Sequence, residues 1–308
     1  MNVQKNKTPP FELSSDLLGI FQYLESLPYK QRKLYIKQHI VSGYPPFFYR
    51  YVSLYPNAVS PNEQPNSIDK LRDILVNSSL WLSGREHFND PFDTHAEVVI
   101  EASNPQQLRE KMKQLYKLHQ PDIKWIERER KINASMANQS ELLANLTLAM
   151  NTAMDKAGAC CLTTEPHNLL MWSHYANFHR GAVLKFDMAK DISTFMKAVK
   201  IDYVKSYPKV NWANETYKEI QKAFLHKFNI WSYEKEWRIF HPLGANTSLS
   251  FKPEALTGII FGCKADDKTK EEVLKLLAER AKIGMPKIKL YNASMHKSNY
   301  KIVIKGEL

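Results

Sequence analysis

Short runs of β-branched and aromatic residues recur along most of the chain, and this pattern constrains the fold more than any other feature. Segments with helical spacing fill several gaps between the runs, which predicts an α+β protein with one large core. The expected strands are Phe47–Ser53, Ser79–Ser83, Ala159–Thr163, Gly181–Phe186, Ala198–Val204, Tyr233–Phe240, Gly258–Gly262, Lys287–Tyr291 and Tyr300–Ile304. The expected helices include Tyr29–Ser42, Ile68–Val76, Trp212–Phe228 and Lys268–Lys282, with an earlier one that ends at Ser26.

Two segments depart from this pattern. The first 45 residues predict two helices, which end before the Pro45-Pro46 break. Residues of about 104–156 are highly charged and helical, without strand signals. We therefore expect an amino-terminal helical extension over 1–45 and a single α+β domain over 46–308, with a helical insertion at about 104–156.

The charge balance favours anionic partners. Lys and Arg number 43 and Asp and Glu number 32, which gives a formal net charge of +11. Such an excess suits nucleic acid, nucleotides or acidic membranes, although dispersed basic charge can also serve solubility alone.

Cysteine usage and hydropathy indicate a cytoplasmic protein without membrane segments. The 3 cysteines, two of them adjacent, cannot form a disulfide framework. The first residues contain no apolar signal core, and no stretch approaches the roughly 18 apolar residues of a membrane span.

The run from Trp231 to Arg238 concentrates charged and aromatic residues in a strand-like setting. Strand alternation would place Glu234, Glu236 and Arg238 on one face, with Tyr233, Trp237 and Ile239 opposite. Two carboxyl groups that close cannot both ionise cheaply, so one is expected to hold its proton unless Arg238 or a ligand compensates. The alternative is an exposed edge strand with a solvated charged face.

Two other segments carry candidate binding residues. Asn89-Asp90-Pro91 forms a polar turn, which either is purely structural or presents Asp90 to a ligand. The segment Asn168–Ala176 is expected to be a helix, which would align Trp172, Tyr175 or Ala176, and the following His179 along one side. These aromatic residues either belong to the core or form a wall for a ring-shaped ligand. Gly181 would allow a close backbone approach or a positive φ.

Several chemistries are disfavoured. Histidines 167, 174 and 179 lack ligand spacing and the adjacent Cys160 and Cys161 would point to opposite strand faces, so no metal is expected. A cysteine nucleophile would have no evident base. The sequence contains neither a phosphate-binding loop nor a dinucleotide-binding glycine motif.

Motifs in a fixed order resemble the family known as domain of unknown function 2971, over about Tyr49 to Phe261. That family name carries no activity, although stand-alone members suggest a toxin or phage-defence role. The residues that carry the resemblance are Tyr49-Arg50-Tyr51, Leu80–Ser83, Phe88–Asp93, Leu162-Thr163, Met171–Tyr175, Gly181 and Glu234–Arg238.

A more distant resemblance is to ADP-ribosyltransferases of the arginine-serine-glutamate type, which have a mixed, partly split sheet. Arg50 matches their basic residue, Thr163 or Thr164 replaces their serine, and Glu234 with Glu236 matches their Glu-x-Glu pair. This resemblance implies ADP-ribosyl transfer or NAD glycohydrolysis with NAD as substrate and a nucleic acid or protein as acceptor.

The same resemblance assigns roles to single residues. Glu236 would stabilise the oxocarbenium-like ribose, and Glu234 would orient or deprotonate the acceptor. Arg50 would bind the pyrophosphate or a ribose through its planar donor fork. The further cofactor-binding candidates are Thr163, Trp172, Tyr175, Asn89, Asp90 and Arg238.

The alternative function is that of a non-catalytic or nuclease-like nucleic-acid-binding protein. Arg50, Arg238 and surface lysines would then follow phosphates, and binding would weaken steeply with salt. The sequence leaves the acceptor and the oligomeric state open.

Overall fold

A computed structural model describes residues 15–39, 44–54, 67–102, 104–214 and 223–306. The chain forms two compact units. Unit 1 contains residues 1–83, 158–201 and 232–308, and unit 2 contains residues 84–157 and 202–231. The boundaries differ from the predicted division at residue 45, because both units are built from segments far apart in the sequence.

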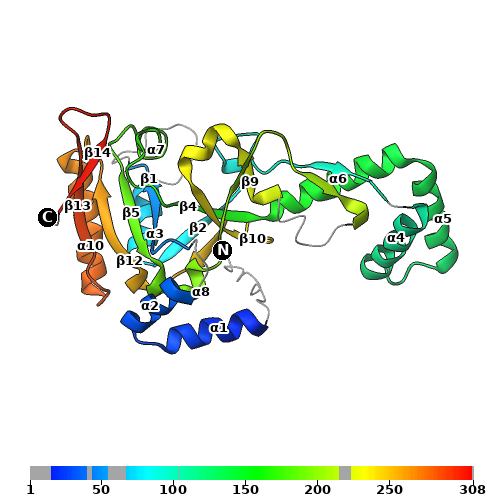
Figure 1. The fold of residues 1–308 in the computed structure, drawn as a ribbon, viewed down its shortest axis with the longest axis horizontal. Helices are drawn as coiled ribbons and strands as arrows, with labels where there is room; N and C mark the ends of the chain where they lie inside the picture. Colours follow the sequence, from blue (N-terminus) through cyan, green and yellow to red (C-terminus); the bar gives the residue numbers. More distant parts are fainter. Residues whose placement is uncertain (1–14, 40–43, 55–66, 103, 215–222, 307–308) are drawn as a thin grey trace, which may run out of the picture. The chain divides into compact units, whose positions relative to one another are not determined.

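Unit 1 is built on a ten-stranded sheet (Figure 1). Its main path has the order β11-β2-β4-β1-β5-β12-β13-β14, and β10 pairs with both β4 and β6. The strand pair β12–β13 is parallel, whereas β1–β4, β1–β5, β10–β4, β10–β6, β11–β2, β12–β5 and β13–β14 are antiparallel, so the sheet is mixed, as expected for an α+β protein. The strands are β1 (Phe47–Val52), β2 (Ser79–Gly84), β4 (Gly158–Thr163), β5 (Ala182–Asp187), β6 (Ala198–Lys200), β10 (Glu236–His241), β11 (Thr247–Ser250), β12 (Leu256–Phe261), β13 (Lys289–Met295) and β14 (Ile302–Lys305).

The sheet is narrowly joined at its centre. Strand β1 pairs with β4 through Tyr49 and Thr163 alone, whereas it pairs with β5 over six residues. Strand β10 also pairs with β4 over six residues. The sheet therefore has two parts that are joined by the single residue pair Tyr49–Thr163. One part is β11-β2-β4-β10-β6, and the other is β1-β5-β12-β13-β14.

The helices of unit 1 are α1 (Ser15–Ser26), α2 (Tyr29–His39), α3 (Ser67–Leu75), α7 (Leu169–Tyr175), α8 (Ile192–Phe195) and α10 (Asp267–Lys282). Phe21 and Leu24 of α1 and Ile36 of α2 belong to the main hydrophobic core, together with residues of the sheet. The amino-terminal helices are thus part of the core of unit 1. Burial of their apolar stripe, more than helix propensity, stabilises helices this short.

Unit 2 contains three longer helices, α4 (Pro105–His119), α5 (Trp125–Ala137) and α6 (Gln139–Lys156), as the charged segment predicted. Asn104 caps α4 by accepting a hydrogen bond from the backbone of Gln107. A small core joins the helices through Leu108, Met112, Ile132 and Leu142. Two parallel strand pairs complete the unit, β3 (Glu97–Val99) with β8 (Lys209–Asn211) and β7 (Asp202–Val204) with β9 (His226–Phe228).

The expected elements Ala198–Val204, Trp212–Phe228 and Tyr233–Phe240 need correction. The expected strand Ala198–Val204 is divided at Ile201 into β6 and β7, which belong to different sheets. The expected helix Trp212–Phe228 ends in strand β9, and its residues 215–222 lie outside the described part of the chain. Long-range strand pairing overrode the local helical spacing at this point. The end of the helix expected over Tyr29–Ser42 also lies outside the described residues.

The expected strand Tyr233–Phe240 begins only at Glu236, because residues 229–234 form a 3₁₀ helix. Lys235 then adopts a φ of 44°, which interrupts an extended strand. Among the residues that the structure describes, no helix combines the length and hydrophobicity needed to span a lipid bilayer.

Candidate active site

Glu236 and Arg238 form a buried ion pair on β10. Arg238 Nε donates to Glu236 Oε1 at 2.6 Å and Nη2 donates to Oε2 at 3.1 Å. The two residues are 3% and 0% exposed, and strand alternation places them on one face as predicted. Because β10 lies between β4 and β6, the alternative of an exposed edge strand is wrong.

Glu234 does not share that strand face. It ends the 3₁₀ helix, is 2% exposed, and accepts a hydrogen bond from the Tyr175 hydroxyl at 2.6 Å through Oε1. The left-handed backbone of Lys235 separates it from the strand. The alternation predicted for Glu234, Glu236 and Arg238 is therefore wrong at its first member, and each acid has a partner of its own.

Thr163 fastens this turn to β4. Its hydroxyl donates to the Glu234 carbonyl at 2.5 Å and accepts from the Glu165 amide at 3.0 Å. Thr163 is also the register partner of Glu236 on β10 and of Tyr49 on β1. Thr163 thus lies where the motif strands meet. Its buried hydroxyl positions the backbone of Glu234 before β10 and that of Glu165 after β4.

Arg50 contacts a cysteine that the sequence did not single out as its partner. Arg50 Nη1 lies 2.7 Å from Cys160 Sγ. Burial raises the pKa of the Cys160 thiol, whereas the charge of Arg50 lowers it. The nearby Glu236 adds to the increase. The thiol is therefore held neutral, which disfavours a nucleophilic role. Cys160 is buried and Cys161 is exposed, so the prediction that they point to opposite faces is confirmed.

Trp172 and Tyr175 of α7 have different environments. Asn168 caps the helix by accepting from the amides of Leu170 and Met171. Trp172 is fully buried, donates to the Pro166 carbonyl at 2.9 Å and packs edge-on against Tyr51. It is a core residue, which was one of the two alternatives given for it from the sequence. Tyr175 is half-buried and reaches Glu234.

The segment after α7 returns the chain to the sheet through an unusual turn. Asn177, Phe178 and His179 all have positive φ, at 46°, 51° and 69°. The helix ends at Tyr175, so His179 is not on the predicted helix side, although its ring stacks on Trp172 at 6.3 Å. A side-chain carbon on Gly181 would lie 2.2 Å from the Val52 carbonyl oxygen, which confirms the predicted close approach.

Asn89 and Asp90 belong to unit 2, whereas the other seven predicted site residues belong to unit 1. Asp90 Oδ1 accepts from the Phe92 amide at 2.9 Å, as in a structural turn, and Oδ2 accepts from Trp231 Nε1 at 2.6 Å. The structure therefore gives Asp90 a clear role within its own unit. The residues predicted as one site are divided between the two units.

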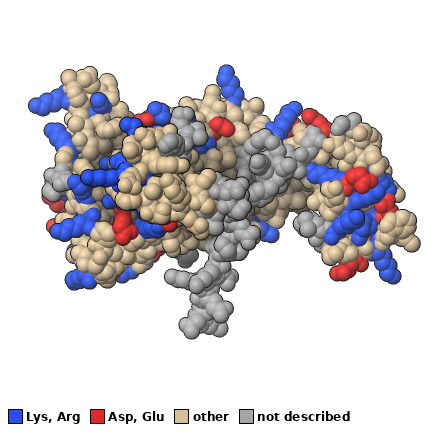
Figure 2. Space-filling view, turned by 60° about the horizontal axis from the view of Figure 1, so that its bottom comes forward, with Lys and Arg blue, Asp and Glu red and all other residues tan. Residues whose placement is uncertain are grey.

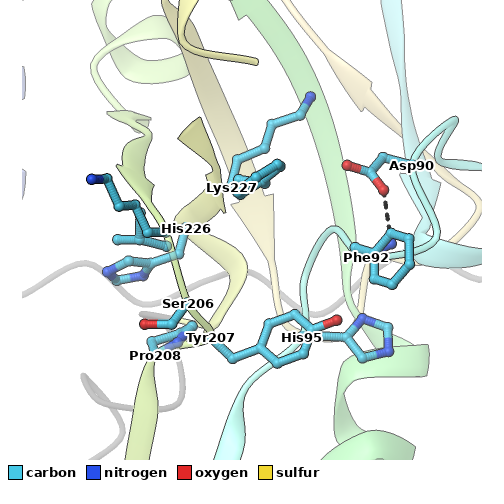
Figure 3. Close-up of a pocket in the computed structure, with 11 residues that line it drawn as sticks. Asp90, Phe92, His95, Ser206, Tyr207, Pro208, His226 and Lys227 are labelled. Atoms are coloured by element: carbon cyan, nitrogen blue, oxygen red, sulfur yellow. Dashed lines mark hydrogen bonds between the residues drawn. The ribbon is translucent and has the colours of Figure 1, made fainter. Parts of the chain in front are cut away.

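Asp90 also lines a pocket of about 410 Å³ in unit 2 (Figure 3). The rings of His95 and Tyr207 stack at 5.6 Å, and Phe92 is 66% exposed. Aromatic walls of this kind suit a flat apolar group. The lining residues are Asp90, Phe92, His95, Val204, Lys205, Ser206, Tyr207, Pro208, His226, Lys227 and Phe228. The sequence could not indicate this pocket, because three separate segments form it and one of them was expected to be helical.

A buried ion pair lies beside the pocket. Lys227 Nζ lies 3.6 Å from Asp93 Oδ2 and 5.2 Å from the ring centre of Trp231. Both charged side chains are almost completely buried. Within the described ranges, no group of three or more His, Cys, Asp or Glu residues is arranged to hold a metal ion.

Residues 171–239 match a family described as "Protein of unknown function (DUF2971)". The match runs from α7 to β10 and includes Tyr175, Gly181, Glu234, Glu236 and Arg238. It confirms the predicted resemblance to this family over those residues. No curated protein and no solved structure matches the chain. The resemblance to ADP-ribosyltransferases stays a prediction.

Proposed function

We propose that unit 1 cleaves the nicotinamide–ribose bond of NAD and transfers ADP-ribose to an acceptor or to water. The observation that supports this proposal is the meeting of the three motif strands. Tyr49 of β1, Thr163 of β4 and Glu236 of β10 are successive register partners, and Arg50 follows Tyr49 directly. The arginine, threonine and glutamate strands of the motif are therefore neighbours at the narrow junction of the sheet.

Glu236 would stabilise the transition state. As the C1′–N bond breaks, its electron pair leaves with the nicotinamide nitrogen and the ribose becomes an oxocarbenium-like cation. A fixed carboxylate stabilises such a cation and can accept a hydrogen bond from a ribose hydroxyl. The bidentate contact with Arg238 holds the Glu236 carboxylate in one orientation.

Glu234 would act on the acceptor. The incoming oxygen or nitrogen forms the new bond to C1′ and loses a proton, which Glu234 can accept. The Tyr175 hydroxyl donates to Glu234 Oε1 and holds this carboxylate, the candidate base, in place. We propose a nucleic acid or protein nucleophile as the acceptor, with free ADP-ribose as the product when water replaces it.

The burial of both acids adds one requirement. Glu234 and Glu236 are 2% and 3% exposed, so NAD can contact them only when the side chains above them move. Turnover would then depend on a conformational step as well as on the chemistry. Arg50 is half-buried at the same junction but points to Cys160, on the opposite face of the sheet from Glu236, so it would have to turn across the junction to guide the pyrophosphate.

The test follows nicotinamide release and label transfer from NAD by the full chain in the presence of cell extract. Glu236→Gln keeps an oxygen that can accept from Arg238 but removes the charge, and we expect turnover to fall about 100-fold or more. Glu165→Gln is the matched control, because Glu165 pairs with Lys235 in the same region and has no proposed catalytic role.

Circular dichroism and thermal unfolding would establish that the variants fold. If Glu236→Gln does not fold, Tyr175→Phe replaces it, since this change removes the hydrogen bond to Glu234 and keeps the ring. A loss of about tenfold in turnover is then expected. Absence of nicotinamide release by the folded wild type, or equal rates in wild type and Glu236→Gln, would contradict the proposal.

A further inference from the structure

Basic and aromatic side chains gather on one face of the sheet in unit 1. Tyr49, Lys185, Gly258 and Lys289 are register partners across the adjacent strands β1, β5, β12 and β13. Paired residues of neighbouring strands point to the same side of a sheet. Phe47 and Tyr291 lie two residues from members of this row, so they project from the same face. We call the surface formed by Phe47, Tyr49, Lys185, Lys289 and Tyr291 the lysine–aromatic face.

Contacts between the side chains confirm that they share one surface. Lys185 Nζ lies 4.0 Å from the ring centre of Phe47 and 6.0 Å from that of Tyr291. Lys33 Nζ of α2 lies 5.3 Å from the same ring centre of Phe47, and we include this lysine in the lysine–aromatic face. In space, these lysines alternate with the aromatic rings. Together, the lysines and rings come from four separate elements, α2, β1, β5 and β13.

Gly258 lies between the two lysines of the row and makes room for the ring of Tyr291. A side-chain carbon at this position would lie 3.0 Å from Tyr291 Cε2 and 3.4 Å from Lys185 Cβ. Neighbouring strands lie about 4.8 Å apart, so Lys185 and Lys289 are roughly 10 Å apart at the backbone, on either side of the glycine. The absence of a side chain at Gly258 therefore lets the Tyr291 ring lie close to β12, between the two lysines.

The lysines of this face carry mutually repelling charges. Burial lowers the pKa of Lys185, and the like charges of Lys33 and Lys289 lower it further, against the opposing effect of Asp187. Asp187 already accepts from the Tyr29 hydroxyl at 2.6 Å and from the Ala189 amide at 3.1 Å. An anionic ligand would relieve this repulsion.

The charge of unit 1 agrees with an anionic ligand. Its sequence contains 28 Lys and Arg and 18 Asp and Glu, a net charge of +10, whereas unit 2 contains 15 and 14, a net charge of +1. In Figure 2, the charged residues at the left are mainly Lys and Arg, whereas those at the right are a mixture of basic and acidic residues. Long-range attraction of a polyanion would thus act on unit 1.

We propose that the lysine–aromatic face binds single-stranded nucleic acid. Lys33, Lys185 and Lys289 would contact phosphates, while Phe47, Tyr49 and Tyr291 would stack on unpaired bases. Cations that follow the backbone and rings that accept any base are the two requirements for binding single strands without sequence preference. Bases in a duplex are already stacked, so the rings favour a single strand.

This assignment replaces the phosphate contacts predicted from the sequence. Arg238 is fully buried in its pair with Glu236, so the prediction that it follows phosphates is wrong. Arg50 points to Cys160 on the opposite side of β1 from Tyr49. The lysines of the sheet face, which carry no sequence motif, take their place. The proposal does not depend on NAD chemistry.

Fluorescence anisotropy of the full chain with labelled RNA and DNA single strands of about 12 nucleotides tests the proposal, with a duplex alongside. We expect the single strands to bind more tightly than the duplex. Three phosphate contacts predict a log–log salt slope of roughly −2 for single strands. Binding of either RNA or DNA with these properties would support the proposal.

Two variants locate the binding site. Lys185→Gln/Lys289→Gln should reduce the salt slope by roughly 1.4, which is the share of two phosphate contacts. Its charge control is the pair Lys275→Gln/Lys270→Gln on α10, for which we expect an unchanged slope. Tyr291→Leu should weaken binding roughly tenfold through the loss of one stacked base. Phe92→Leu in unit 2 is the aromatic control.

The outcomes that would overturn the proposal are equally specific. They are the absence of binding to any single strand at low salt, equal affinity for the duplex, or a dissociation constant that neither Lys185→Gln/Lys289→Gln nor Tyr291→Leu changes. Thermal unfolding of each variant would show that the sheet is intact. Because no step of this experiment uses NAD, its failure and that of the proposed catalysis are separate results.

Discussion

The two units bury charge in the same way but differ in what they offer to a partner. Unit 1 buries the Glu236–Arg238 pair in a large sheet and carries nearly all of the net positive charge of the chain. Unit 2 buries the Asp93–Lys227 pair, is close to neutral, and encloses an aromatic pocket. The comparison teaches that the overall charge of a chain does not describe its parts, since only unit 1 is suited to attract a polyanion over a distance.

The buried pair of unit 1 should give the largest effect. Arg238→Met leaves the Glu236 carboxylate without its bidentate partner, and we expect the free energy of unfolding to fall by about 5 kcal/mol. Urea unfolding measures this change. Arg72→Met is the control, because Arg72 pairs with Glu279 at the surface. We expect this substitution to lower the free energy of unfolding by about 1 kcal/mol or less. Similar losses in both variants would mean that the burial of the pair has no energetic consequence.

The buried pair of unit 2 should give a smaller effect. Lys227→Met removes the cation that lies 3.6 Å from the buried Asp93 carboxylate, a longer contact than that of Glu236 with Arg238, so we expect a loss of about 3 kcal/mol. Hydrogen exchange read by mass spectrometry should show faster exchange in β7 and β9 and unchanged exchange in β1 and β5. Lys113→Met, at a surface pair of α4, is the control. Faster exchange throughout the chain would show that the two units unfold as one.

The smallest expected effect concerns acid sensitivity of unit 1. Burial, with a contribution from Lys264, lowers the pKa of His179 below its ordinary value. The unfolded chain therefore takes up this proton first, so the stabilising contribution is present above the unfolded pKa of about 6.5 and is lost as pH falls toward the folded pKa. His179→Asn tolerates the positive φ and does not titrate.

Urea unfolding of wild type and His179→Asn between about pH 7.5 and 5 measures this difference. The wild type should lose more stability than the variant on acidification. Parallel pH profiles of the two proteins would contradict the assignment to His179.

The amino-acid sequence was sufficient for most of the sheet of unit 1. The runs at β1, β2, β4, β5 and β12 were expected close to their observed bounds, because buried strands carry dense β-branched and aromatic residues. The helices of the 104–156 segment were also expected, since their charged surface has no strand signal. The alternation of Glu236 and Arg238 follows from strand geometry alone.

The sequence failed where a contact between distant segments decided the local structure. The left-handed Lys235 and the turn held by Thr163 removed Glu234 from the strand face. Strand β9 formed within an expected helix because β7 lies beside it. Local propensity is a weak preference, and pairing or burial elsewhere in the fold outweighs it.

By itself, then, the sequence determined the strands, the helical segment and the family resemblance of α7 to β10, because these depend on residue type and spacing. Only the tertiary structure decided which side chains share a surface. It buried Trp172 and Arg238, paired Arg50 with Cys160, and assembled the lysine–aromatic face from β1, β5, β13 and α2. Register between strands fixes such neighbours, and register depends on the packing of the whole sheet.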